Sequence, residues 1–157
     1  IFHLTTHAFF KALLFLSAGS VIHAMHHEQD MRKMGGLFKK IPFTATMMWI
    51  GSLAIIGFPY LSGYYSKESI LENAFYASNG IAYFAYLVGI LTALLTAFYS
   101  WRLLFLTFHG ENRSNNKTYD QAHESPLVMT VPLFILAIGS IFSGIFFADY
   151  FLSLIHI

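Results

Sequence analysis

The sequence contains no cysteine and few charged residues. The absence of cysteine excludes a disulfide framework, a thiolate nucleophile and iron–sulfur ligation within these 157 residues. Lysine, arginine, aspartate and glutamate make up 11% of the chain, whereas a soluble domain carries about 25%. The nine basic and eight acidic residues nearly cancel. No charge excess therefore points to a nucleic-acid partner.

Hydrophobic residues fill the sequence instead. They account for 56% of the chain, aromatic residues for 18%, and phenylalanine alone occurs 17 times. This composition predicts an all-α, polytopic membrane protein. We expect residues 1–157 to form a single membrane segment with about four transmembrane helices. Their predicted ranges are about 2–24, 41–76, 81–108 and 126–148.

The second predicted helix is interrupted. Four residues that weaken or break helices gather within seven positions: Gly57, Pro59, Ser62 and Gly63. Proline removes one amide donor and clashes with the carbonyl four residues back, so the helix should kink or open near Pro59. The spacing of Ser69 and Glu72 is that of a capping box, which predicts that a helix restarts near Ile70. Transporters place ion sites at such breaks.

One lysine lies inside the first apolar segment. Lys11 is the only charged residue between Ala8 and Ile22, and a charge at bilayer depth costs at least about 2.5–3.5 kcal/mol. His3, His7 and Lys11 are spaced four residues apart, which places them on one face of a helix as a ladder about 12 Å long. Three protonatable groups in a row indicate a proton path.

Structural interpretations remain open for Lys11 and for a second lysine, Lys67. Lys11 would have no role in transport if its side chain only snorkelled to the membrane surface. It lies, however, roughly 12–15 Å from either end of the apolar stretch. Lys67 follows the interruption. It is either a surface lysine paired with Glu68 or Glu72, or a protonatable group beside an opened helix.

A histidine-rich loop follows the first helix. Its side chains are of the types that ligate metals: His23, His26, His27, Glu28 and Asp30. They lack a recognised ligand spacing, so we expect no metal site. This loop and the one over residues 109–125 carry all of the loop lysines and arginines. Both loops should therefore face the cytoplasm or the matrix.

Three sequence motifs together resemble a known family. They are His3-Leu-Thr-Thr-His7-Ala-Phe-Phe-Lys11, Gly63-Tyr-Tyr-Ser66-Lys67-Glu68 and Phe108-His109-Gly110. In this order they are similar to the distal antiporter-like subunits of respiratory complex I, the chain 5 or bacterial subunit L family. These subunits have further helices before the region that this chain resembles and a lateral helix after it. We therefore expect the chain to be a fragment or one product of a split gene.

The resemblance implies proton translocation driven by electron transfer from NADH to ubiquinone elsewhere in the complex. On the matching positions, Lys11 is the central membrane lysine, His7 and His3 are its relay, and Lys67 with Glu68 leads to the outer side. No cofactor is expected in this chain, because FMN, the iron–sulfur clusters and quinone belong to other subunits. The implied enzyme is the NADH dehydrogenase complex, with no redox chemistry in this chain.

The implied partners are other membrane-arm subunits, the rest of the same subunit and membrane lipids, with no nucleic acid. An isoleucine-, phenylalanine- and asparagine-rich composition favours the mitochondrial inner membrane over a bacterial plasma membrane.

Two rival functions stay open at this point. One is a subunit of a multisubunit cation/proton antiporter, and the other is a structural membrane subunit without transport.

Overall fold

The computed structural model describes residues 1–77 and 79–153, with side chains up to residue 147. Every element of regular secondary structure over these residues is a helix. Its elements are α1 (Phe2–Ala24), two 3₁₀ turns η1 (Met31–Lys33) and η2 (Leu37–Lys39), α2 (Pro42–Ile56), α3 (Ser62–Tyr76), α4 (Gly80–Phe108), α5 (Asn116–Gln121) and α6 (Leu127–Ser153).

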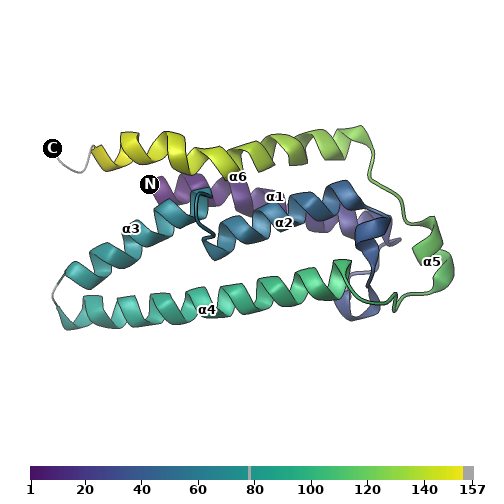
Figure 1. Cartoon of the computed structure of the whole chain (residues 1–157), viewed down its shortest axis with the longest axis horizontal. Coiled ribbons are helices and arrows are strands. Elements are labelled where there is room, and N and C mark those ends of the chain that lie inside the picture. Colours follow the sequence, from purple (N-terminus) through teal and green to yellow (C-terminus); the bar gives the residue numbers. More distant parts are fainter. Residues whose placement is uncertain (78, 154–157) are drawn as a thin grey trace.

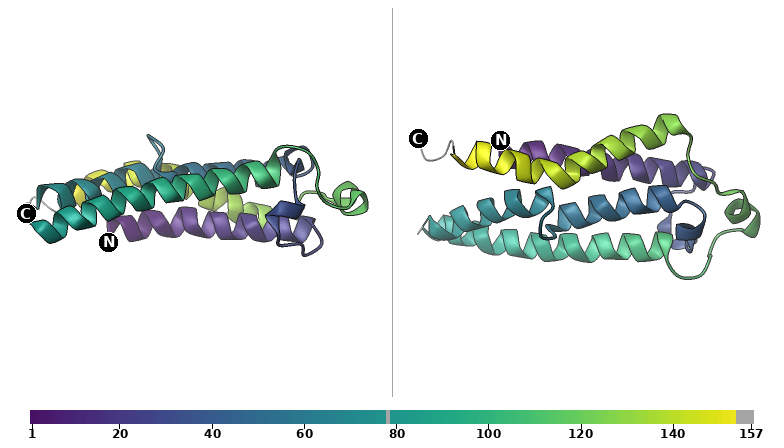
Figure 2. Two further views of the ribbon diagram at one scale, coloured as in Figure 1. Left: turned by 90° about the horizontal axis from the view of Figure 1, so that it is seen from below. Right: turned by 45° about the horizontal axis from the view of Figure 1, so that its top comes forward.

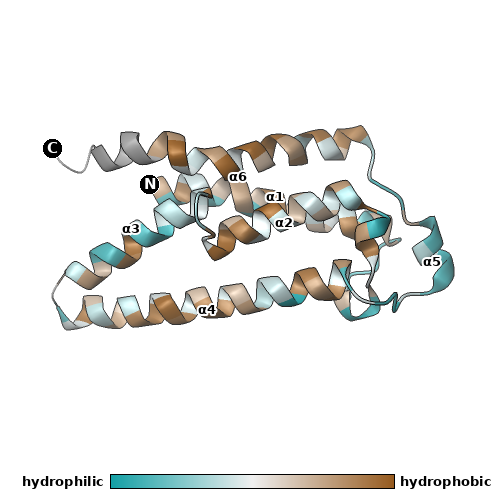
Figure 3. Cartoon of the chain, viewed as in Figure 1, coloured by the Kyte–Doolittle hydropathy of each residue, from teal (hydrophilic) through white to brown (hydrophobic). Residues whose placement is uncertain are grey.

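The long helices lie roughly side by side along one direction (Figures 1 and 2). α1 packs against α2 and α6, while α4 contacts α2 and α3. The two loops that hold η1, η2 and α5 lie at one end of the bundle, and the turn between α3 and α4 lies at the other (Figure 1). Figure 3 shows apolar long helices and polar loops.

Three helical stretches are long and apolar enough to cross a membrane: Phe2–Ala24, Gly80–Phe108 and Leu127–Phe147. α2 is apolar but shorter. It continues into α3 after a short loop, so the two helices together form one interrupted segment (Figure 1). This architecture confirms the all-α membrane class with an interrupted second segment. α6 extends a few residues past the end expected from the sequence.

The interruption begins at Gly57. This residue adopts φ +91°, a left-handed conformation that ends α2 and that glycine tolerates best. Pro59 follows in the loop, and α3 begins at Ser62. The prediction of a helix start near Ile70 is wrong, because Ser69 lies inside α3. Its hydroxyl donates to the carbonyl of Tyr65 at 2.9 Å and caps nothing.

α2 is capped from a distant part of the chain. Its N-cap residue is Ile41, which has no polar side chain. The Glu124 carboxylate, from the loop before α6, accepts hydrogen bonds from the amides of Phe43 at 3.0 Å and Thr44 at 3.2 Å. It also accepts the hydroxyl of Thr44. A carboxylate at this position satisfies free amides and suits the positive end of the helix dipole.

Three helices meet at this cap. The hydroxyl of Ser20 on α1 lies 2.9 Å from that of Thr44 and 2.6 Å from that of Ser125. All three side chains are buried. The loop end of the bundle is therefore held by hydrogen bonds between α1, α2 and the start of α6. Neither the cap nor the short helices in the two loops were expected from the sequence.

An apolar core lies beneath these loops. Met25, Leu37, Ile41, Leu104 and Phe108 are almost fully inaccessible, and they form one cluster that joins α1, η2, α2 and α4. Beside it, the rings of Trp49 and Trp101 meet edge to face with their centroids 5.4 Å apart. This packing attaches the loop end of α4 to α2.

Candidate functional site

The predicted ladder of α1 lies on one side of the helix. The rings of His3 and His7 stack with centroids 5.5 Å apart, and the ring of His7 is 5.1 Å from that of Phe10. Lys11 follows one turn later, and its side chain is exposed in this chain. The helical period therefore places the three groups one above another on the same face of α1.

The His3 end of the ladder reaches α3 through buried hydroxyls. His3 Nδ1 lies 3.0 Å from Ser66 Oγ. Thr6 donates to the same oxygen at 2.9 Å, and Ser66 donates to the carbonyl of Ser62 at 3.2 Å. A hydroxyl that both accepts and donates can hold an imidazole in place and exchange a proton with it.

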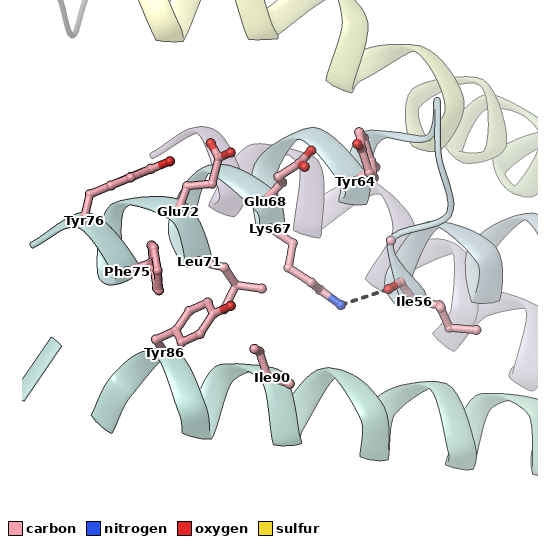
Figure 4. Close-up of a pocket in the computed structure, with 11 residues that line it drawn as sticks. Ile56, Tyr64, Lys67, Glu68, Leu71, Glu72, Phe75, Tyr76, Tyr86 and Ile90 are labelled. Atoms are coloured by element: carbon pink, nitrogen blue, oxygen red, sulfur yellow. Dashed lines mark hydrogen bonds between the residues drawn. The ribbon is translucent and has the colours of Figure 1, made fainter. Parts of the chain in front are cut away.

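Lys67 fills the interruption between α2 and α3. Its Nζ donates to the carbonyl oxygens of Ile55 at 2.9 Å and Ile56 at 3.2 Å. Both carbonyls belong to the last turn of α2. Because the helix is interrupted there, no amide of a following turn bonds to them. A cation at this position also suits the negative end of the helix dipole. Figure 4 shows the side chain directed at Ile56.

The acidic neighbours of Lys67 lie on another side of α3. In Figure 4, Glu68 and Glu72 point away from the lysine. Within the described residues neither carboxylate forms an ion pair with Lys67. Lys67 therefore lies beside the opened helix and is not paired with either carboxylate. Its role as a protonatable site residue stays a prediction.

One cavity collects the protonatable groups of α1 and α3. It has a volume of about 480 Å³ and lies between α1, α3 and α4. His3, His7, Lys11 and Lys67 all line it, so four of the five predicted site residues share one space. Glu68 does not. It lines a neighbouring cavity of about 340 Å³, which also reaches Lys67.

The opposite wall of the large cavity comes from α4. Thr92, Thr96 and Tyr99 line it, although sequence reasoning did not select them. The threonine hydroxyls donate to carbonyls one turn earlier, at 2.8 and 2.7 Å, which leaves their lone pairs as acceptors. The available signal was their spacing, which places all three on one side of a largely apolar helix.

The charged groups of the first loop interact with one another. Arg32 binds the Asp30 carboxylate at 2.8 Å, and its hydrogen bonds lower the pKa of Asp30 to about 2. Lys33 lies 3.2 Å from Glu28. Among the residues that the structure describes, no three histidine, aspartate or glutamate side chains are arranged to hold a metal ion.

Comparisons with known families cover almost the whole chain. Residues 1–96 match the model of the NADH:quinone oxidoreductase/Mrp antiporter transmembrane region. Residues 99–157 match the model of the NADH dehydrogenase subunit 5 C-terminus. The boundary between the two matches falls inside α4.

Individual relatives are similar at more than half of the aligned positions. Subunit L of NADH-quinone oxidoreductase from Rhodobacter capsulatus is 56% identical over 95% of this chain and 23% of its own length. Chain 5 of NADH-ubiquinone oxidoreductase from Metridium senile is 59% identical over 92% of this chain and 24% of its own. The corresponding Marchantia polymorpha protein is 53% identical over 98% and 23%. The chain thus spans about a quarter of the length of the curated relatives it matches.

Proposed function

This chain belongs to the NADH:quinone oxidoreductase/Mrp antiporter family, and we propose that it is part of the distal proton-translocating subunit of respiratory complex I. The observation that carries the proposal is the single cavity lined by His3, His7, Lys11 and Lys67. A lysine can take up and release a proton, and histidines are efficient proton shuttles. Protonatable groups on membrane helices usually mark ion pathways.

In the proposed mechanism, Lys11 holds a proton and exchanges it along the cavity with His7 and His3 or with Lys67. A change of charge in a neighbouring subunit drives the exchange. At an effective dielectric constant of 20, a unit charge about 8 Å away contributes about 2 kcal/mol. Such an energy changes a proton-binding equilibrium more than tenfold. Glu68, beside Lys67 in the adjoining cavity, would accept the proton on its way to the outer side.

In the proposed assembly, other subunits carry out electron transfer and provide the remaining membrane helices. Electron transfer from NADH to ubiquinone would take place in other subunits, and this chain would carry no redox chemistry. The remaining helices of the subunit, other membrane-arm subunits and lipids would cover the exposed side of Lys11. We propose the mitochondrial inner membrane as its location, with a bacterial plasma membrane as the alternative, since relatives occur in both settings.

Two rival functions predict different results. A subunit of a multisubunit cation/proton antiporter, which the family also includes by name, would give sodium-dependent proton flux without NADH oxidation. A structural subunit would need Lys11 for assembly only. The proton-pumping proposal requires that Lys11 affect coupling in a complex that assembles normally.

The test is the proton-to-electron ratio of assembled complex that carries Lys11→Met. Methionine has about the length of the lysine stem and cannot be protonated. We expect a lower ratio, or coupled turnover reduced severalfold, with a normal amount of complex. Lys117→Met is the matched control, because Lys117 is an exposed residue on α5. An unchanged ratio and turnover in Lys11→Met would reject the proposed role of this lysine.

A further inference from the structure

A polar cavity lies at the loop end of the bundle, apart from the candidate site. It has a volume of about 450 Å³ and opens between the loop that follows α1 and the loop that precedes α5. Both loops lie at the same end of the bundle (Figure 1). None of the proposed proton-transfer residues lines this cavity, so it is a separate feature of the chain.

Arg113 is a fixed cation on one wall of this cavity. Its Nε donates to the carbonyl oxygen of Arg32 at 3.0 Å, and its Nη2 donates to the carbonyl oxygen of Leu106. Carbonyls hold the guanidinium in place but do not neutralise its charge, and the ion pairs among the described residues do not include Arg113. An arginine has five N–H groups, so three remain as donors after two such bonds. Their planar arrangement suits the oxygens of a phosphate.

The charges around the cavity leave an excess of positive charge. Lys33 lies 3.2 Å from Glu28, the single carboxylate among the described residues that line the cavity. The amides of Asp30 and Gln29 donate to Glu28 at 3.0 and 3.1 Å, and the bond from Asp30, followed by that from Lys33, lowers the pKa of Glu28. Glu28 is therefore ionised and already has its partners. Two cations and one anion leave one positive charge, which Arg113 carries.

Uncharged donors accompany the two cations. His26 and His27 form part of the wall, and their backbones adopt φ +51° and +68°, the left-handed region that residues other than glycine rarely occupy. The side-chain oxygen of Asn115 accepts the amide of Lys117 at 3.3 Å, which leaves its Nδ2 to donate. Thr118 adds a hydroxyl to the wall. Donors from both loops therefore converge on one space, as an anion with several oxygens requires.

The cavity lies at the depth of lipid headgroups. It begins directly after α1, which ends at Ala24, and close to the end of α4 at Phe108. Both helices are long and apolar enough to cross a membrane, so residues just beyond their ends lie in the polar region of the bilayer. We expect these basic loops to face the inner side, where pockets lined by lysine and arginine bind anionic headgroups.

We propose that this cavity binds an anionic phosphate group, with Arg113 and Lys33 as its charged partners and Asn115 as a neutral donor. The phosphate belongs to a lipid headgroup or to a solute, since both present the same oxygens. Once bound, it connects the loop after α1 to the loop before α5. None of these residues belongs to the proposed proton relay, so phosphate binding and proton transport can be tested separately.

Asn115→Asp tests the site with the smallest change of shape. Aspartate keeps the oxygen that accepts the Lys117 amide, so α5 keeps its cap. The substitution removes one donor and places a negative charge in the cavity. Asn116→Asp is the matched control, because it makes the same change one residue further on, at an exposed position that does not line the cavity.

The measurement is hydrogen–deuterium exchange of the loop amides in purified, delipidated complex. Peptides that cover residues 25–33 and 111–118 report on the cavity. In one arm, inorganic phosphate is added in detergent, with sodium chloride of equal ionic strength as the control for screening. In the other arm, the complex is placed in nanodiscs of phosphatidylcholine with or without phosphatidylglycerol, an anionic lipid.

We expect exchange in both peptides to slow at least threefold in one arm or both, in unmodified complex and in Asn116→Asp. Asn115→Asp should abolish this slowing. Slowing by inorganic phosphate alone identifies a solute as the ligand, and slowing by phosphatidylglycerol alone identifies a lipid headgroup. Either result supports the phosphate site, because both depend on the same donors.

The absence of slowing in both arms would overturn the proposed site. Equal slowing in Asn115→Asp and Asn116→Asp would also overturn it, because the effect would then be a general one of charge. Exchange that is already slow in delipidated complex and that neither addition changes would show that a neighbouring protein chain fills the cavity, which again contradicts the proposal. If Asn115→Asp lowers the amount of complex, Lys33→Gln removes a cation of the cavity without changing the cap of α5. Its control is Lys39→Gln, at an exposed position outside the lining.

Discussion

Lys67 has two possible tasks at the scale of a single residue. Its ammonium group binds the free carbonyls of Ile55 and Ile56, at 2.9 and 3.2 Å, which makes it a C-terminal cap of α2. It also lines the cavity that contains Lys11, which makes it a candidate for proton transfer. The cap would hold the lysine beside the break whether or not it transfers protons.

Substitutions of Lys67 separate the two tasks. Lys67→Met leaves two carbonyls without their charged donor, and each hydrogen bond to a charged group is worth about 1.5–3 kcal/mol. We expect less assembled complex and a lower proton-to-electron ratio. Lys67→Arg keeps donors for the carbonyls but does not release its proton. It should restore assembly, measured on native gels, without restoring the ratio. Normal pumping by Lys67→Arg would make this residue purely structural.

At the scale of the helices, the break between α2 and α3 depends on close backbone contact. Gly63 lies in the first turn of α3 against the end of α2. A Cβ on Gly63 would overlap the carbonyl oxygen of Ala54, and a backbone atom cannot move aside without moving α2. The two short helices therefore approach each other more closely than any side chain at this position allows.

Glycine substitutions test this contact. We expect Gly63→Ala to destabilise the chain by about 1–3 kcal/mol or more, the usual cost of overpacking, and to lower the amount of chain in assembled complex. In Gly89→Ala the new Cβ meets only a methyl group of Leu71, which can rotate away, so the effect should be smaller. The measurement is the quantity of this chain in purified complex. Equal quantities in both variants would contradict the close-contact interpretation.

At the scale of the whole molecule, the two ends of the bundle are held differently. At the loop end, Glu124 joins the start of α6 to Thr44 on α2, and Ser20 connects α1 to both. Toward the other end, α4 packs against α3, and most of its surface is exposed and apolar. Hydrogen bonds between buried side chains therefore connect the helices at the loop end.

Glu124 should contribute to stability without affecting pumping. Glu124→Ala removes a cap, a change that typically costs about 0.5–2 kcal/mol, and it leaves the buried hydroxyl of Thr44 without one of its partners. We expect a lower inactivation temperature of purified complex and an unchanged proton-to-electron ratio. Glu111→Ala is the control, because Glu111 is an exposed carboxylate in the same loop. A fall in the ratio with Glu124→Ala would instead place Glu124 near the proton route.

The sequence by itself determined the membrane class, the extent of the long helices and the order of His3, His7 and Lys11 on one face of α1. These features depend on local properties: hydropathy summed along a helix, and a period of 3.6 residues per turn. Gly57 and Pro59 located the break for the same reason, since both act on their own backbone. The similarity to a known family also follows from the sequence alone.

Only the tertiary structure decided which distant groups meet. The direction of Lys67 toward α2 and away from Glu68, the wall that Thr92, Thr96 and Tyr99 provide, and the cap that Glu124 supplies all depend on how separate helices pack. The start of α3 at Ser62 is a further example, because the contact of Gly63 with Ala54 outweighs the capping-box pattern at Ser69. Contacts between helices follow from the shapes of both surfaces at once, so no local pattern in one segment specifies them.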